Sequence, residues 1–346
     1  SMAIAVDAMG GDTPIGIKVE AAVEAINDFG IEVVLVGTEK EIIQELRSYK
    51  FDNNKLRIVN STEIVEMNES PATSLRQKKD SSIRVAVNLV KEGDAEAVVS
   101  AGNTGASMAT AKFVLKSIEG IERPAIATLM PSIHRKNPFV LIDIGANTDC
   151  KPLYLLQFAL MGDAYARNYL NLDSPRVALL NNGEEEGKGY IELKETYSLL
   201  KQSTLNFTGN IEGKAMFKDL ADVVVCDGFI GNIALKVAEG TFDFVRSILR
   251  EEIKDNFFSK LGYLAMKGPF ASLRERADYS EVGGAPLLGV NGVIIICHGN
   301  SKSYSLKNAI KHAKECVDQR LKDKIASEIL ENLEVIQKAK NLNSES

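Results

Sequence analysis

One local pattern recurs along the chain: a short apolar run leads directly into a small turn rich in glycine and amide side chains, and a helical pattern follows. It occurs at residues 4–12, 97–106, 140–147, 223–232 and 293–301. Continuous apolar runs are typical of buried parallel strands, and open α/β sheets bind ligands at the carboxyl ends of their strands. Glycine lets backbone N–H groups approach a ligand, and a helix N-terminus favours an anion. The five turns therefore predict a shared crevice for a negatively charged group.

Strand-like and helical patterns alternate between these turns. Helices are predicted near 14–29, 39–49, 70–91, 104–117, 152–171, 189–201 and 230–253, with further strands near 32–37, 56–60 and 176–180. This alternation predicts an α/β fold with a doubly wound, mainly parallel sheet. Since no linker is evident in the 346 residues, we expect a single α/β catalytic domain over 2–340, with one or two amphipathic helices from about 302 to 340.

Composition narrows the classes of partner and cofactor. Lys plus Arg number 41 against 47 Asp plus Glu, so a nucleic-acid surface is not expected. The four cysteines are widely spaced and suit a reducing cytoplasm, and no apolar run reaches the ~18 residues of a membrane span. The sequence has no P-loop, no GxGxxG, no GxSxG and no HExxH motif. The crevice therefore suits a phosphate-type anion, and we expect neither a metal nor a cofactor.

Residues 242–276 interrupt the alternation, because aromatic and aliphatic side chains are interleaved with Lys and Arg and no strand is evident. One interpretation is a helical pair that covers the sheet or forms a dimer interface. The other is a protruding helical hairpin that rests on an anionic membrane surface. The residues assigned to that membrane contact are Phe257, Phe258, Leu261, Leu264 and Met266.

The glycine-rich turns supply candidate anion-binding groups. Two glycines, an amide and two hydroxyls at residues 100–105 can surround a phosphate, although a tight turn with a helix cap would use the same residues. Phosphate or substrate binding is assigned to Gly10, Gly11, Gly102, Asn103, Thr104, Gly105 and His298. His298 alone among the histidines follows a predicted strand. It could support the residues that bind the substrate, or it could be purely structural. His134 and His312 are expected on the surface.

A second set of polar candidates lies after the strand near 223–225. Asn232 and Lys236 are four residues apart, so they share one helix face. A lysine and an amide on one face can hold an anion or stabilise an oxyanion, while a salt-bridged first helical turn is the plainer alternative.

Taken together and in order, these motifs resemble those of the acyl-ACP:phosphate acyltransferases of bacterial phospholipid synthesis, the PlsX family, over nearly the whole chain. The matching segments are Asp7–Asp12, Ser70-Pro71, Ser100–Ala106, Asp143–Asn147, Asp227–Phe229, Gly231-Asn232 and Gly283–Gly289. The resemblance implies a fold similar to phosphotransacetylases and isocitrate/isopropylmalate dehydrogenases, with a protruding helical tip. It also implies a cytoplasmic homodimer that is peripherally attached to the membrane.

The reaction implied by the resemblance moves a long-chain fatty acyl group from the thioester of acyl carrier protein to inorganic phosphate. The acyl phosphate would then pass to a membrane-bound acyl-phosphate:glycerol-3-phosphate acyltransferase. Phosphate is itself the nucleophile, so the site has to orient it and stabilise the oxyanion. We assign Asn147, Asn182, Asn232 and Lys236 to polarising the carbonyl or binding phosphate oxygens. Asp227 is expected to orient Lys236 or Asn232 and not to act as a base.

Two other functions stay open on the sequence alone. A small-acyl phosphotransacetylase using coenzyme A would share the anion crevice and the thioester chemistry but would not need an amphipathic tip. A non-catalytic, membrane-associated scaffold would account for residues 242–276, but it would have no use for phosphate-binding turns.

Overall fold

The computed structural model describes residues 3–134, 137–254, 262, 266–269, 271 and 283–345. Its strands are β1 (Ile4–Asp7), β2 (Val33–Gly37), β3 (Leu56–Asn60), β4 (Ala97–Ser100), β5 (Ala125–Met130), β6 (Phe139–Ile142), β7 (Val177–Asn181), β8 (Phe207–Glu212), β9 (Val223–Val225), β10 (Ala285–Leu288) and β11 (Val293–Ile296). They form one 11-stranded sheet in the order β3-β2-β1-β4-β11-β10-β5-β6-β9-β7-β8.

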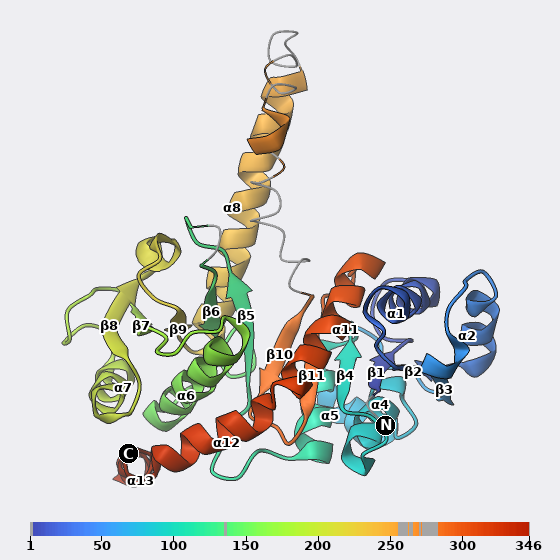
Figure 1. Cartoon of the computed structure of the whole chain (residues 1–346). Coiled ribbons are helices and arrows are strands. Elements are labelled where there is room, and N and C mark those ends of the chain that lie inside the picture. The colour runs from blue at the N-terminus through green and yellow to red at the C-terminus, as the bar shows by residue number, and fades with distance from the viewer. Residues whose placement is uncertain are drawn as a thin grey trace.

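Helices cover both faces of this sheet. They are α1 (Ile15–Phe29), α2 (Glu39–Leu46), α3 (Pro71–Gln77), α4 (Ser82–Glu92), α5 (Thr104–Leu115), α6 (Pro152–Tyr169), α7 (Ile191–Gln202), α8 (Gly228–Lys254), α11 (Ser303–Asp318), α12 (Leu321–Glu331) and α13 (Leu333–Glu345). Figure 1 shows the first part of the chain building one end of the sheet, the middle part building the other, and α8 projecting away from both.

The two halves of the sheet run in opposite directions. Strands β3, β2, β1, β4 and β11 are parallel to one another, and so are β6, β9, β7 and β8. Between them, β10 and β5 make three successive antiparallel pairings: β11 with β10, β10 with β5, and β5 with β6. Three reversals turn the second half around, so its carboxyl ends lie at the opposite edge of the sheet.

The mainly parallel, doubly wound sheet is therefore confirmed, while the reasoning that led to one crevice is corrected. The five turns do not meet along a single sheet edge, because the antiparallel strands β10 and β5 reverse the second half of the sheet. Neither of these strands was recognised as antiparallel from the sequence. Strand β8 was also missed. Two other boundaries differ: the helix predicted over 70–91 is divided into α3 and α4, and the C-terminal segment forms α11, α12 and α13.

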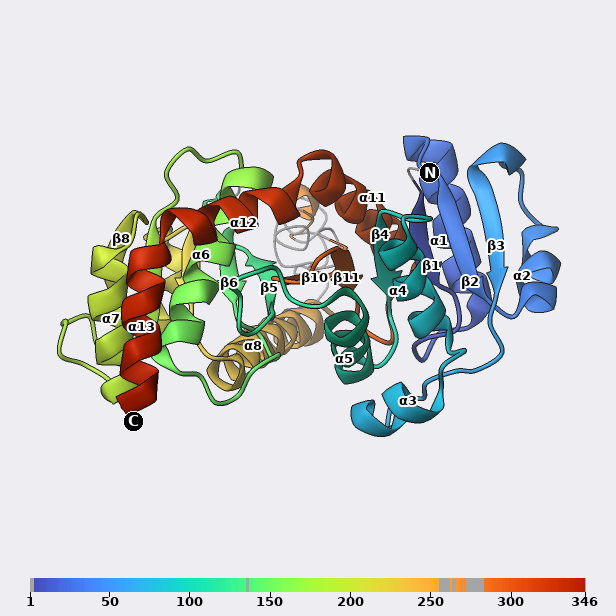
Figure 2. The same ribbon diagram turned by 90° about the horizontal axis from the view of Figure 1, so that it is seen from below.

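The core explains why the strands read as continuous apolar runs. Ile4 and Val6 of β1 pack with α1 and α11 on one face, and Ala5 between them packs with α4 and α5 on the other. Both faces are buried, so alternate residues serve different apolar layers. In the second half of the sheet, α6 covers the first face, while Leu235 of α8 packs with β6 and β9 on the second. Figure 2 shows α5 and α8 on one side, and α6, α12 and α13 on the other.

Only part of the predicted helical tip can be compared with the structure. Helix α8 runs without interruption to Lys254, so the first third of residues 242–276 belongs to one long helix. Phe257, Phe258, Leu261 and Leu264 lie outside the described residues, whereas Met266 is exposed. No helix in the described part of the chain combines the length and apolarity needed to cross a bilayer. The predicted domain limits, 2–340 and 242–276, stay predictions.

Candidate functional site

The turns that follow β1, β4 and β11 touch one another through glycines. A Cβ added at Gly10 would lie 2.8 Å from Gly102 Cα. Gly11 has φ +94°, and a Cβ there would lie 2.6 Å from Ala101 O and 2.9 Å from Gly299 O. Since no side chain fits at either position, only glycine permits this backbone packing. The structure thus brings Gly10, Gly11 and Gly102 together, while their assignment to phosphate or substrate binding stays a prediction.

Asp7 organises this first group of turns. Its carboxylate is buried at the end of β1 and accepts hydrogen bonds from Gly10 N at 3.0 Å and from Ser100 Oγ at 2.8 Å. Ser100 Oγ in turn accepts from Gly102 N at 3.1 Å. The amides of Gly10 and Gly102 therefore already have acceptors within the protein, so their direct contact with phosphate stays a prediction.

Free backbone donors lie at the start of α5. The first N–H groups of a helix have no partner within the helix, and none of the hydrogen bonds recorded among the described residues uses Thr104 N or Gly105 N. Thr104 is exposed, and it directly follows the glycine-packed turns. This helix start carries the positive end of the helix dipole, which favours an anion such as phosphate.

Asn103 has a structural task that the sequence analysis had named only as an alternative. Its Oδ1 accepts from Ala106 N at 3.0 Å and caps α5, while its Nδ2 donates to the carbonyl oxygens of Glu66, Met67 and Glu69 at 2.9–3.2 Å. The loop over 66–69 is thereby held against the start of α5. A direct contact between the Asn103 side chain and phosphate stays a prediction.

Lys18 is a residue that the sequence analysis missed. It is 1% exposed on α1, and its Nζ donates to Thr13 O. Burial lowers the pKa of Lys18, and the neighbouring Asp7 and Asp12 act in the opposite direction. Its amino group therefore lies close to the acidic side chains of Asp7 and Asp12 in the first group of turns. The signal in the sequence was a lone lysine on the apolar face of a predicted helix.

A second group of turns follows β6 and β9. The carboxylate of Asp143 is fully buried and accepts hydrogen bonds from the backbone N–H groups of Ile126, Gly145, Ala146 and Asn147 at 2.8–3.2 Å. Burial raises the pKa of Asp143, and these hydrogen bonds oppose that rise. The aspartate thus fixes the shape of the turn and makes no contact with solvent.

Asn147 and Asp227 are both tied into this second group. Asn147 Nδ2 donates to Pro124 O at 2.8 Å and to Asp143 Oδ2 at 3.0 Å, so its amide group is committed to the turn. Asp227 accepts from Ile230 N at 2.8 Å and from Tyr190 Oη at 3.2 Å. The contact with Tyr190 links the turns after β7 and β9. Burial raises the pKa of Tyr190, and the negative charge of Asp227 raises it further.

Asn232, Lys236 and Asn182 have exposed side chains, as a substrate site requires. Asn232 lies opposite Gly145, because a Cβ added at Gly145 would be 4.0 Å from the Asn232 Cβ and Cγ atoms. Lys236 follows one helical turn later on α8. Asn182 lies after β7, where its backbone N donates to Asn181 Oδ1 at 2.8 Å.

Helix α8 connects the two groups of turns. Its start lies against the second group, since Gly228 N donates to Asn147 O at 2.6 Å. Glu239, one turn beyond Lys236, has its Oε1 atom 3.9 Å from Nε2 of His298, which follows β11 in the first group. Glu239 lies eleven residues after Gly228, and eleven helical residues rise ~16 Å, which is about the length of a five-residue strand. The helix therefore spans the sheet from one carboxyl edge to the other and carries Asn232 and Lys236 between them.

Glu239 was missed although the sequence carried a signal for it. It follows Asn232 by seven residues and Lys236 by three, so all three share a helix face. His298 is largely exposed, as expected for a site residue, and His134 is exposed as predicted. His312, in contrast, is 1% exposed, so its prediction as a surface residue is wrong: it belongs to α11, and its ring faces α6, where it is hydrogen-bonded to Tyr165.

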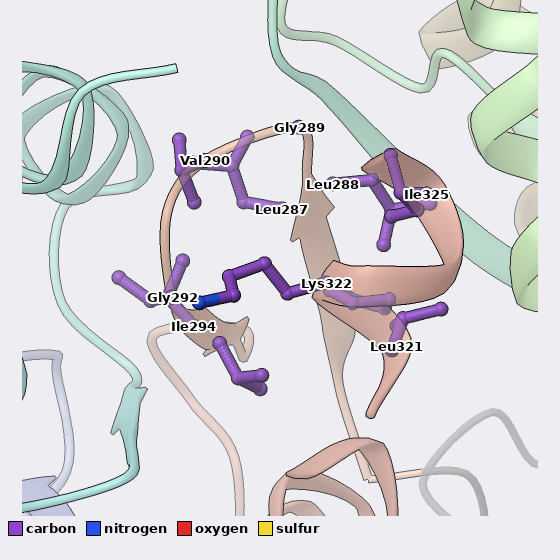
Figure 3. A pocket seen from close by; sticks show the side chains of 11 residues that line it. Leu287, Leu288, Gly289, Val290, Gly292, Ile294, Leu321, Lys322 and Ile325 are labelled. Atoms are coloured by element: carbon purple, nitrogen blue, oxygen red, sulfur yellow. The ribbon is translucent and has the colours of Figure 1, made fainter. Parts of the chain in front are cut away.

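A separate pocket lies between the β10–β11 hairpin and α12 (Figure 3). It is a shallow hollow whose empty space of about 260 Å³ includes open solvent, and its lining is apolar except for Lys322. Figure 3 shows the Lys322 side chain extending from α12 toward Gly292. The pocket adjoins the amino end of β11, away from the turn that carries His298. It therefore contributes nothing to the candidate site. No group of three or more His, Cys, Asp or Glu side chains suited to a metal ion occurs within the described ranges.

Comparison with known proteins places the chain in a family. The family model described as "Fatty acid synthesis protein" matches residues 2–324. A phosphate acyltransferase of Geotalea uraniireducens (strain Rf4) is 48% identical over 331 residues, which cover 96% of this chain and 95% of that protein. One from Dictyoglomus turgidum (strain DSM 6724 / Z-1310) is 50% identical, covering 94% and 96%. The chain belongs to the phosphate acyltransferase family. The resemblance inferred from the sequence motifs is thereby confirmed.

Solved structures support the fold of this family member. A phosphotransacetylase from Streptococcus pyogenes superposes with a TM-score of 0.63 at 19% identity, covering 92% of this chain and 94% of that one. The EutD phosphotransacetylase from Staphylococcus aureus gives 0.61 at 15% identity, with the same coverage. The predicted similarity to the phosphotransacetylase fold is thereby confirmed.

Proposed function

We propose that this chain transfers a long-chain fatty acyl group from the thioester of acyl carrier protein to inorganic phosphate, which forms acyl phosphate for phospholipid synthesis. The observation that supports the proposal most strongly is the course of α8. The helix carries Asn232 and Lys236 between the first group of turns, which packs through its glycines and has free N–H groups at the start of α5, and the second group of turns. Membership of the phosphate acyltransferase family supports the same reaction.

Phosphate binding is assigned to the start of α5. The N–H groups of Thr104 and Gly105 point out of the first helical turn and can donate to phosphate oxygens. Gly11 and Gly102 contribute by keeping the surrounding backbone close and free of side chains. Buried Lys18 reduces the repulsion that Asp7 and Asp12 would exert on an incoming anion.

The acyl group is proposed to lie against α8. Lys236 is an exposed cation without a recorded partner among the described residues, and Asn232 is an exposed amide donor one turn earlier. Donors aimed at the developing oxyanion of a thioester carbonyl lower the barrier to attack by phosphate. Asp227, held by Ile230 N and Tyr190, positions the start of α8 and does not act as a base.

The homodimer and the peripheral membrane attachment are part of the same proposal. Ile233, Val237, Phe244 and Ile248 are all exposed on α8 at spacings of four and seven residues, so they form one apolar stripe. Such a stripe on a projecting helix supports contact with a second copy or with lipid. The tip residues, including exposed Met266, are proposed to meet an anionic, cytoplasmic-side membrane, where a membrane-bound acyltransferase would take up the acyl phosphate.

The test is direct: the full chain is incubated with palmitoyl-acyl carrier protein and radiolabelled phosphate, and labelled acyl phosphate is measured. We expect product without added metal or nucleotide. Loss of activity in excess EDTA that only a divalent cation restores would contradict the mechanism. A strong preference for acetyl-CoA would favour the small-acyl phosphotransacetylase instead. Absence of product from every thioester would remove the enzymatic proposal.

A further inference from the structure

His298 and Glu239 form a contact between the first group of turns and α8. His298 Nε2 lies 3.9 Å from Glu239 Oε1, with 74% of the histidine side chain and 32% of the glutamate side chain exposed. The histidine follows β11, and the glutamate belongs to α8. The ring is therefore accessible to a substrate from one side and faces a carboxylate on the other.

The surroundings of this pair separate it from an ordinary surface ion pair. Gly299, the next residue after His298, accepts a hydrogen bond from Asp12 N at 2.8 Å and packs against Gly11, so the ring is attached to the proposed phosphate turns. Glu239 lies one helical turn beyond Lys236. A comparable pair, His134 and Asp219 at 4.0 Å, lies in two loops that belong to neither group of turns and provides an internal comparison.

The proposed reaction requires a proton to move. At neutral pH phosphate is a mixture of H₂PO₄⁻ and HPO₄²⁻, of which the dianion is the stronger nucleophile. As its oxygen attacks the thioester carbonyl, a C–O bond forms, the C–S bond breaks, and a thiolate leaves. The products are an acyl phosphate dianion and a thiol, so the proton of hydrogen phosphate has to reach the sulfur. Charge and atoms then balance without any additional reactant.

We propose that His298 carries this proton from phosphate to the leaving sulfur and that Glu239 positions its ring; the inference rests on the proposed acyl transfer to phosphate. Glu239 faces Nε2, which leaves Nδ1 as the nitrogen that accepts the proton and returns it to the thiolate. Imidazole exchanges protons readily near neutral pH, and such transfer contributes about 10²–10⁴-fold to a rate. The long contact in the free protein shortens when substrate fills the site, as catalytic hydrogen bonds commonly do.

The decisive experiment varies the leaving group. Wild type and His298→Gln are compared with two palmitoyl thioesters, one of an alkyl thiol of high pKa and one of an aryl thiol of low pKa, each with phosphate. A thiolate of low pKa leaves without protonation. We expect His298→Gln to lose roughly 10²-fold in kcat with the alkyl thioester and only a few-fold with the aryl one. The matched control, His134→Gln, keeps wild-type rates with both.

Equal losses with both donors would mean that His298 serves binding or folding and would overturn the proton-transfer role. Unchanged rates with both would do the same. Should wild type form no acyl phosphate from these donors or from palmitoyl-acyl carrier protein, the proposed function itself would fail, an outcome that differs from failure of the proton-transfer role.

Glu239→Gln tests the positioning role separately. We expect a smaller loss in kcat than for His298→Gln, the same dependence on the leaving group, and an unchanged KM for phosphate. A raised phosphate KM without dependence on the leaving group would assign Glu239 to substrate binding and would contradict the positioning role.

Discussion

Gly231 of α8 packs directly on the main-chain carbonyl of Asp143: a Cβ added at residue 231 would lie 1.8 Å from that oxygen. The Asp143 turn cannot easily yield, because the carboxylate of the same residue is buried and holds four backbone N–H groups. This contact sets how closely α8 approaches the turn after β6, and with it the position of Asn232 opposite Gly145.

Replacing this glycine gives the first prediction. The Cβ of Gly231→Ala pushes the backbone of α8 away from the backbone of the Asp143 turn. We therefore expect the free energy of unfolding to fall by roughly 3 kcal/mol, at the upper end of overpacking effects. Acyl transfer should be reduced as well. Urea unfolding measures the first quantity. Gly240→Ala is the matched control in the same helix: no atom of the described residues lies within 4 Å of its added Cβ, and alanine is the better helix former, so stability is expected to rise slightly. Similar behaviour of the two variants would contradict the packing argument.

The second prediction concerns the exposed donors on α8. Lys236→Ala and Asn232→Ala are each expected to lower turnover by roughly 10²-fold, the scale of losing one oxyanion donor, while unfolding stays unchanged. Steady-state kinetics with palmitoyl-acyl carrier protein provide the measurement. Lys91→Ala, an exposed lysine near the end of α4, serves as the control. A folded Lys236 or Asn232 variant with wild-type kinetics would remove that residue from the site.

The third prediction separates the two functions of Asn103. Asn103→Ala removes the cap of α5 and the hydrogen bonds to three carbonyl groups of the 66–69 loop, one of which, that of Glu66, still accepts from Glu69 N. We therefore expect a loss of about 2 kcal/mol in stability and a raised KM for phosphate. Asn103→Asp retains the capping oxygen and should recover part of the stability, but its charge should raise the phosphate KM further. Asn206→Ala, whose exposed amide makes one remote contact, is the control. An unchanged KM in both variants would exclude a phosphate site at the start of α5.

The fourth prediction follows from the buried histidine. Burial between α6 and α11 lowers the pKa of His312 to about 4 from 6.5, and its ring contacts Tyr165 and Tyr169. Between these pH values the unfolded chain binds more protons than the folded one, so stability should fall as pH falls from about 6.5 to about 4, by roughly 3 kcal/mol. His312→Gln should lack this component.

The measurement is the difference between the unfolding free energies of wild type and His312→Gln across that pH range. Other titrating groups are common to both proteins, including Glu328, whose pKa burial raises to about 6. A difference that does not change with pH would refute the assignment.

The fifth prediction tests the membrane tip, most of which lies outside the described residues. Leu261→Glu or Leu264→Glu should abolish co-sedimentation with anionic vesicles, because a charge replaces apolar contact with lipid, while turnover in a soluble assay stays largely intact. Binding by the wild type should weaken with salt, since neighbouring cations each contribute about 1 kcal/mol near an anionic surface. Variants that still sediment would show that the anchor lies elsewhere. Loss of soluble turnover in a folded variant would instead assign the segment to carrier binding or dimerisation.

The sequence by itself determined the local elements and their chemistry. Apolar runs such as 97–100 and 223–225 marked buried strands, the turns marked their carboxyl ends, and the order of motifs identified the family. These features are local, because strand burial, glycine conformations and helix starts are encoded within a few residues. The spacing of Asn232 and Lys236 likewise gave their common helix face.

Only the tertiary structure decided how these pieces face one another. The antiparallel pairings of β10 and β5 depend on hydrogen bonds between distant segments, and they separate the turns into two groups at opposite sheet edges. The commitment of Asn103 and Asn147 to distant carbonyls, the burial of His312, and the approach of His298 to Glu239 depend on the same packing. No local pattern encodes such contacts, because their energy is realised only when both segments are folded.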